Sequence, residues 1–384
     1  MRQLIYLALI CFILMFSVTM IYPVVKHYVI DKYKATVSQA SLFVAVNLIA
    51  YAIFAPVWGS LSDKLGKRKI FITIGLLGNS AMLFLQAVAP NLSLLMLFRF
   101  IEGIFTVMVY SIAMTLVLDV ARREAYGRGM GVIGMGIATG MAFGAPFGGF
   151  LGSLDPVTPF YTASLLIFLA FILALIVLED VEVVSSKSVL EGIIVAKKRK
   201  ELLVPYLFSF VDRFTAGFFV SVFPIMLGTL YHMTPKEIGI YLSSFLMPFA
   251  LLQYPGGFIS DRFGRFKPLI FGSFIYGICI SSVGFLTPPA IAFSMLVAGV
   301  AAAVILPASS ALSGDLAPKE LKGAAIGGFN FSGSLGFAFG PAVAGFIAEK
   351  YGFSQTFYVA GISVFIVTFA AILLLRKWKI NEAS

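Results

Sequence analysis

The chain has 384 residues, of which 60% are hydrophobic and only 12% are charged, and its mean hydropathy is +0.98. A soluble domain carries about 25% charged residues, so this composition excludes a water-soluble globular protein and indicates a membrane protein. The formal net charge of +10 is accounted for below by membrane topology, and no nucleic-acid partner is needed to explain it.

Twelve apolar runs follow one another along the chain, and each is long enough to cross a bilayer. Lipid offers no partner to backbone groups, so we expect every run to be a helix. The first run lacks a cleavage site and is expected to be a first span. A polar segment at 179–201 separates a predicted N-terminal six-helix bundle (1–178) from a C-terminal one (202–384). The runs are 4–25, 38–61, 70–89, 92–118, 127–152, 158–178, 203–230, 236–260, 268–286, 289–315, 323–348 and 354–375.

Lysine and arginine residues indicate on which side of the membrane each connection lies. If the N-terminus is cytoplasmic, 21 of the 28 lysines and arginines fall in cytoplasmic segments and five fall outside. Cytoplasmic loops carry the excess of positive residues. We therefore expect a multi-pass protein of the cell membrane with both termini in the cytoplasm.

A charged connection occurs twice, 198 residues apart (257 − 59). Residues 59–69 read GSLSDKLGKRK and residues 257–267 read GFISDRFGRFK. Each copy separates two apolar runs, and Asp119 and Asp315 repeat at a similar offset. Six spans per copy, both entering from the same side, indicate a parallel duplication about an axis along the membrane normal.

The repeated connection has the form G-x-x-x-D-x-x-G-[RK]-x-[RK], and its position resembles that in the major facilitator superfamily. The resemblance implies an all-α membrane protein with twelve transmembrane helices in two pseudo-symmetric six-helix bundles. It also implies a cytoplasmic latch, in which the motif aspartate and basic residue meet an acidic residue at the inner end of span 4 or span 10. The alternative is that these charges only fix topology. The latch positions are Asp63, Lys67, Asp119, Asp261, Arg265 and Asp315.

Span 4 carries Arg99 and Glu102 inside an apolar run. Ionisable residues at that depth are costly and usually functional, and a spacing of three places both on one helix face. Proton uptake by Glu102 would break a pair with Arg99. The segment from Arg99 to Gly103 resembles the family motif R-x-x-x-G, which often has glutamine where Glu102 stands. The alternative is a permanent salt bridge that only fixes helix packing.

Span 7 contains Asp212 and Arg213. The residue that corresponds to Asp212 in the first half is Cys11, so only the second half carries this charge. Asp212 is therefore a second candidate for proton coupling. The alternative is an ion pair of Asp212 with Arg213 or with the basic linker.

Span 5 is rich in glycine and reads GMGIATGMAFGAPFGGFLG over 134–152. It resembles the antiporter motif of the family, which ends G-P-x-x-G-G, but Ala145 shifts the spacing by one residue. The resemblance implies hinges at Gly144 and Pro146, and at Gly340 and Pro341 in span 11. Close helix packing through the glycines is the alternative.

In the family, spans 1, 4, 7 and 10 line a central cavity. Such a lining would here be mostly apolar and aromatic, which suits hydrophobic or amphipathic compounds better than sugars. The implied cavity residues are Met15, Thr19, Tyr22, Thr106, Tyr110, Phe218, Phe219, Ser309 and Ser310.

We therefore expect a secondary active transporter that works by alternating access. Proton-coupled, multidrug-type efflux is the first hypothesis, with Glu102, Asp212 and Arg99 in proton coupling. A proton-coupled uptake symporter of a small organic solute and a lipid or lysolipid flippase are the alternatives.

Some chemistry is not expected from this sequence. It contains no G-x-x-x-x-G-K-[ST] loop for nucleotide phosphates, and no nucleophile–base or metal constellation is evident. We therefore expect neither an ATP-driven pump nor an enzyme, and no cofactor or metal. We expect the protein to be a monomer. Its expected partners are a small-molecule substrate, protons and the lipid bilayer, and no nucleic acid.

Overall fold

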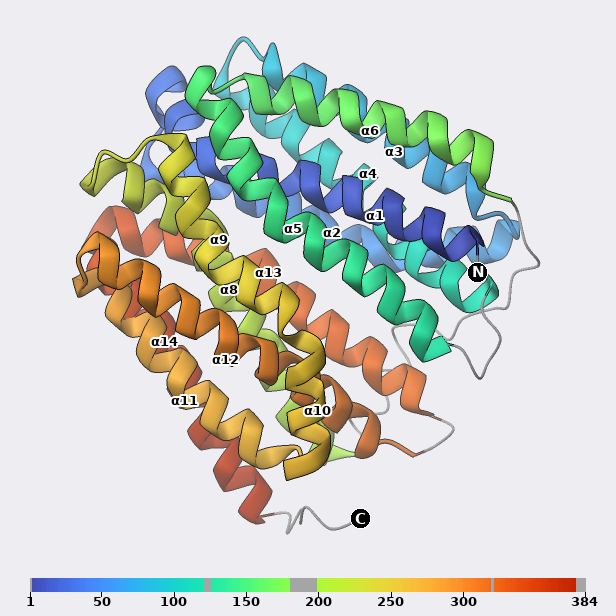
Figure 1. Ribbon diagram of the computed structural model, residues 1–384, viewed down its shortest axis with the longest axis vertical. Coiled ribbons are helices and arrows are strands. Elements are labelled where there is room, and N and C mark those ends of the chain that lie inside the picture. Colours follow the sequence, from blue (N-terminus) through green and yellow to red (C-terminus); the bar gives the residue numbers. More distant parts are fainter. Residues whose placement is uncertain (1, 121–125, 180–198, 319–320, 378–384) are drawn as a thin grey trace. The chain divides into compact units, whose positions relative to one another are not determined.

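The structure is a computed structural model that describes residues 2–120, 126–179, 199–318 and 321–377. Within these ranges all regular elements are helices (Figure 1). Most of the predicted linker, 179–201, lies outside the described residues.

The first half of the sequence forms six long helices and two short helical turns between α1 and α2. Their bounds are α1 (Arg2–Met20), η1 (Tyr22–Val24), η2 (Lys26–Asp31), α2 (Val37–Leu65), α3 (Lys69–Ala87), α4 (Leu92–Val120), α5 (Tyr126–Leu154) and α6 (Thr158–Val177).

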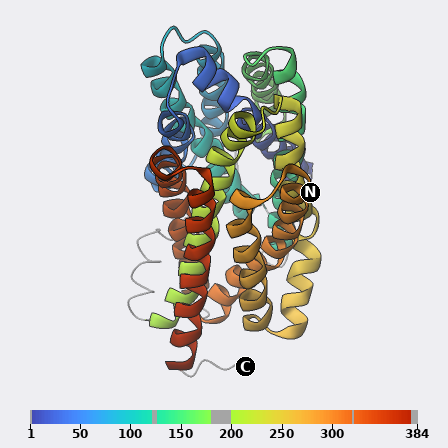
Figure 2. The same cartoon turned by 90° about the vertical axis from the view of Figure 1, so that its left-hand side faces the viewer.

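The second half repeats this plan, with one additional break. Within it, α11 packs against both α12 and α14 (Figure 2). The bounds are η4 (Lys200–Leu202), α8 (Leu203–Leu230), α9 (Pro235–Leu251), α10 (Gln253–Phe263), α11 (Phe266–Ser282), η5 (Val283–Phe285), α12 (Pro288–Asp315), α13 (Lys322–Tyr351) and α14 (Phe353–Lys377).

Eleven helices of the described chain are long and apolar enough to cross a membrane, and the pair α9 and α10 brings the number to twelve if it forms one span. The predicted uninterrupted run 236–260 is wrong in this respect, because α9 and α10 meet at a bend of 50°. Pro255 has no N–H to donate to the carbonyl of Leu251, and its ring disfavours a continuous helix there. Two glycines that follow Pro255 weaken the helix further.

The described chain divides into two compact units. Unit 1 is Met1–Ser186 with Pro224–Ser243, and unit 2 is Lys187–Phe223 with Ser244–Ser384. Pro224–Ser243, the end of α8 and the start of α9, therefore packs with the helices of the first half. Gly149 of α5 and Gly239 of α9 lie against each other's helix backbones at this contact.

Within unit 1, α1 and α5 pack along a stripe of glycines, here called the α5 glycine stripe. A Cβ at Gly140 would lie only 2.5 Å from the carbonyl oxygen of Phe12, so only a hydrogen fits there. This close approach allows dense packing where lipid provides no hydrophobic driving force. The stripe and the α1 carbonyls that it meets are Gly136 with Ala8, Gly140 with Phe12, Gly144 with Phe16, and Gly148 with Met20.

Unit 2 contains the corresponding contact between α13 and α8. Gly336 and Gly340 lie against the carbonyl oxygens of Phe210 and Phe214. Both α5 and α13 continue as single helices through Pro146 and Pro341. The structure thus shows a packing role for the glycines, and hinge motion at these prolines stays a prediction.

Candidate functional site

Arg99 and Glu102 form an ion pair inside unit 1. Both lie on α4, and Nη1 of Arg99 is 3.0 Å from Oε2 of Glu102. The two side chains are 1% and 0% exposed. The i, i+3 spacing therefore brings the predicted pair together in a place from which solvent is excluded.

Glu102 accepts hydrogen bonds from three further side chains on three helices. Asn47 of α2 donates to Oε2 at 2.5 Å, and Asn79 of α3 is 3.3 Å from Oε1. Thr106, one turn along α4, donates to Oε1 at 2.8 Å. An ionised carboxylate is a pure acceptor, so four converging donors, counting Arg99, suit the deprotonated form of Glu102.

The network around Glu102 contains one hydrogen-bond donor and one acceptor that are not used. Among the described residues, Nε of Arg99 and Oδ1 of Asn79 are buried without a hydrogen-bond partner. The Arg99 guanidinium also lies 4.8 Å above the ring of Phe43, a cation–π contact. Protonated Glu102 would need an acceptor, which Asn79 can provide, and Arg99 would lose its only counter-ion in the network.

Sequence reasoning identified Arg99, Glu102 and Thr106, but it missed Asn47, Asn79 and Phe43. The two asparagines carried a usable signal, because an amide inside an apolar span is costly without a partner. Tyr22, a predicted cavity residue, is buried and close enough to Arg99 and Glu102 for a coulombic interaction with each.

The other predicted cavity residues are dispersed over both units. Met15 and Thr19 are buried on α1, where the Thr19 hydroxyl donates to the Met15 carbonyl at 2.9 Å. The Ser309 hydroxyl donates in the same way to Leu306, within α12. The remaining residues are buried or half-buried, and their role in a cavity stays a prediction. They are Tyr110, Phe218, Phe219 and Ser310.

Asp212 and Arg213 point to different sides of α8. Asp212 borders a small pocket in unit 2 together with Ser273 and Tyr276. Arg213 instead donates to Ser209 and contacts Asn330 of α13. In the part of the chain that the structure describes, Asp212 and Arg213 form no ion pair, so the predicted alternative of that pair is wrong.

The first charged connection forms a buried cluster at the ends of α2, α3 and α4. Arg68 lies 2.8 Å from Asp119 and 2.6 Å from Asp63, and it also donates to Ser62. The predicted basic residue, Lys67, is exposed, so the choice of Lys67 over Arg68 was wrong. Gly66 ends α2 with φ 62° and ψ 22°, a left-handed turn that places the next residue outward and Arg68 inward.

The second charged connection forms the same cluster one residue earlier. Arg265 pairs with Asp261 and lies 3.0 Å from Asp315. Gly264 has φ 83° and ψ 166°, so the chain leaves this turn extended and the first residue after it faces inward. The arginine is 25% exposed here, against 0% for Arg68.

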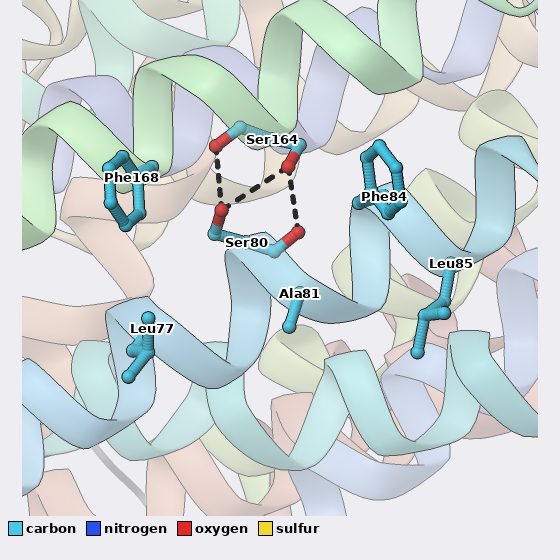
Figure 3. A pocket seen from close by; sticks show the side chains of 7 residues that line it. All are labelled: Leu77, Ser80, Ala81, Phe84, Leu85, Ser164 and Phe168. Atoms are coloured by element: carbon cyan, nitrogen blue, oxygen red, sulfur yellow. Dashed lines mark hydrogen bonds between the residues drawn. The ribbon is translucent and has the colours of Figure 1, made fainter.

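A surface pocket of about 400 Å³ between α3 and α6 is not a candidate site (Figure 3). Its lining is apolar except for Ser80 and Ser164. Each serine hydroxyl donates to the backbone carbonyl of the other at 2.8 Å, so these hydroxyls join the helices and are not available to a ligand.

Comparison with known proteins identifies relatives over the whole chain. The family model Major Facilitator Superfamily matches residues 7–208 and 205–382. The multi-drug resistance efflux pump PmrA of Streptococcus pneumoniae is 26% identical over 339 residues, covering 85% of this chain and 83% of that protein. The quinolone resistance protein NorA of Staphylococcus aureus is 28% identical over 365 residues, covering 92% of each chain.

Solved structures share the fold at lower identity. A bacterial homologue of the human lysosomal transporter Spinster, in an inward-facing and occupied conformation, has a TM-score of 0.83 at 16% identity, covering 97% of this chain and 96% of that one. A D-xylose–proton symporter has a TM-score of 0.78 at 14% identity, covering 96% of both chains. The predicted all-α, two-bundle class of membrane fold is confirmed.

Proposed function

The chain belongs to the major facilitator superfamily, and from this membership we propose that it exports hydrophobic or amphipathic small molecules across the cell membrane in exchange for protons. The names of its relatives, a multi-drug resistance efflux pump and a quinolone resistance protein, support this direction and this substrate class. Both termini are cytoplasmic in this proposal, and the working unit is a monomer.

The observation that carries the proposal is the buried network around Glu102. With Glu102 ionised, the Arg99 charge is compensated and both carboxylate oxygens are satisfied. A proton on Glu102 removes that compensation in a medium of low dielectric constant, where an unpaired charge is very unfavourable. Protonation therefore favours a different arrangement of α2, α3 and α4, and this difference is what proton coupling requires.

Each predicted group has a place in the cycle. Glu102 takes up a proton from the outside and releases it to the cytoplasm as substrate is loaded, and Arg99 then holds the carboxylate. Asp212 is the second candidate for this step. The clusters of Arg68 and Arg265 act as the cytoplasmic latch, and Pro146 and Pro341 as hinges.

The experiment compares Glu102→Gln with the wild type in inverted membrane vesicles, with ethidium as the probe. Because the vesicle lumen corresponds to the outside of the cell, an acidic lumen should drive ethidium inward. Glu102→Gln should abolish this accumulation, because glutamine has no proton to exchange. Ethidium binding to detergent-purified protein should stay within about twofold of the wild type.

The matched control is Glu349→Gln, the same chemical change at an exposed position at the end of α13. It should transport as the wild type does. Acid-driven accumulation retained by Glu102→Gln would remove the proposed role of Glu102. Ethidium leaving the acidic lumen together with protons would instead identify uptake symport.

A further inference from the structure

Arg213 is a second arginine deep within a membrane span. It lies ten residues after the first residue of α8 (213 − 203), or about 15 Å along the helix. This is about half of a hydrocarbon core of roughly 30 Å. The side chain is half-buried, so part of it is accessible.

Arg213 contacts three uncharged side chains among the described residues. Nη1 donates to the hydroxyl of Ser209 at 2.6 Å, and Nη2 lies 3.4 Å from Oδ1 of Asn330. The guanidinium carbon is 5.5 Å from the ring centre of Phe329. Gly333 of α13 makes the space, because a Cβ there would overlap the guanidinium. The two helices thus hold the head group of Arg213 in place.

Among the described residues, no acid lies in direct contact with Arg213. Arg68, Arg99 and Arg265 each have a carboxylate oxygen within 3.0 Å. Among the described residues, Arg213 has none within the 4.0 Å of an ion pair, because Asp212 faces the pocket at Ser273 and Tyr276.

The surface around Arg213 is also polar where lipid would demand apolar groups. Asn330 is exposed on α13, next to the half-buried Arg213. An amide and a cation facing hydrocarbon would be costly, so this face of α8 and α13 borders water. Half-buried Phe210 and Phe214 stack 5.7 Å apart on the same helix and supply apolar surface beside the charge.

We propose that Arg213 and Asn330 form a recognition site for the anionic group of an amphipathic substrate, a carboxylate in the preferred compounds. Buried Ser209 donates to the Phe329 carbonyl and accepts from Arg213, so it positions the guanidinium and does not contact the substrate. This inference rests on the proposed function and specifies its substrate class. Arginine suits the role because its planar donors bind a carboxylate in bidentate geometry, and the aromatic stack accepts the apolar part of the same molecule.

The test measures equilibrium binding of two fluorescent probes to the purified full-length protein in detergent. The probes are pyrene-1-butyrate and its uncharged amide, which differ in charge but hardly in shape. The wild type should bind the acid more tightly. Arg213→Gln should weaken acid binding about tenfold and change amide binding less than about twofold.

Two further variants keep the result interpretable. Asn330→Asp places a carboxylate of the protein itself beside Arg213, where it competes with the acid probe. Position 330 is exposed, so this variant should fold and weaken acid binding selectively even if Arg213→Gln does not fold. Arg376→Gln removes an exposed arginine at the end of α14 and should bind both probes as the wild type does.

Several results would overturn the proposal. A wild type that binds the acid no better than the amide would do so, and so would an equal loss for both probes in Arg213→Gln and Asn330→Asp, which is the mark of a packing role. Phosphatidylglycerol that displaces the acid, and co-purifies with the wild type but not with Arg213→Gln, would assign the site to a lipid headgroup instead.

The binding test is independent of proton coupling. Loss of acid selectivity in both Arg213→Gln and Asn330→Asp supports the recognition site whatever the result of the vesicle experiment with Glu102→Gln. The opposite outcome is also distinguishable. If Glu102→Gln still couples transport to protons while the wild type binds the acid selectively, the proposed coupling fails and the recognition site stands.

Discussion

The two halves of the chain share one charged connection, but they place it in different surroundings. In the first half, Arg68 and Asp119 are both 0% exposed. In the second half, Arg265 is 25% and Asp315 52% exposed. A buried ion pair depends on both partners being present, whereas an exposed pair contributes little. The ion-pair cluster of the first copy should therefore contribute more to stability than that of the second copy.

The same inequality extends into the spans. The first half encloses its carboxylate, Glu102, in a set of four donors. The second half has Arg213 without an acid partner among the described residues, and Asp212 beside a small pocket. The comparison suggests a division of labour, with proton exchange in the first half and recognition of charge on the substrate in the second.

The largest expected difference concerns transport. Asp212→Asn should keep acid-driven ethidium accumulation in inverted vesicles, whereas Glu102→Gln should reduce it to the level of vesicles without the protein. The reason is that Glu102, unlike Asp212, is paired with an arginine, and protonation of Glu102 would leave that arginine uncompensated. If Asp212→Asn also loses accumulation, proton coupling involves both halves and the division of labour fails.

The next difference concerns stability. Arg68→Gln leaves two acids near a buried position and should lower the free energy of unfolding by about 3–5 kcal/mol. Arg265→Gln affects exposed groups and should lower it by about 0–1 kcal/mol. Denaturant titration of the purified variants in detergent measures both. Equal losses would show that exposure does not distinguish the two clusters.

The smallest effect concerns a feature that the halves have in common. Gly140→Ala and Gly336→Ala both press a methyl group against a backbone carbonyl of the neighbouring helix, and each should cost about 1–3 kcal/mol of unfolding free energy. Gly134 has open space at its Cβ position, so Gly134→Ala should stabilise by up to about 1 kcal/mol. A loss in only one half would extend the inequality to helix packing.

Much of the fold was predictable because it depends on patterns along one helix. Apolar runs located the spans, and the i, i+3 spacing placed Arg99 against Glu102. The break between α9 and α10 was missed, although Pro255 is visible in the sequence. Pro56 lies inside the unbroken α2, so a proline alone does not decide. Pro255 is followed by Gly256, which lies against the backbone of α12, and this close approach distinguishes it from Pro56.

The parts of the site that were missed depend on how helices are rotated about their axes. Nothing in the local sequence of α2 or α3 shows that Asn47 and Asn79 meet at one carboxylate of α4. The choice between Lys67 and Arg68 depended on the ψ angle of one glycine, which differs between the two copies of the motif. Such angles follow from packing across the bundle, so a repeat in sequence does not guarantee a repeat in geometry.

The α5 glycine stripe limits how α1 and α5 can move past each other. Its four contacts recur every fourth residue on both helices, so the two helices interlock with a repeat of about 6 Å along their axes. Sliding by a residue or two would drive side chains of α5 into the backbone of α1. The two helices can therefore rotate or tilt against each other at this contact, but they cannot slide gradually along it. Any axial shift between them must move one helix by four residues at once.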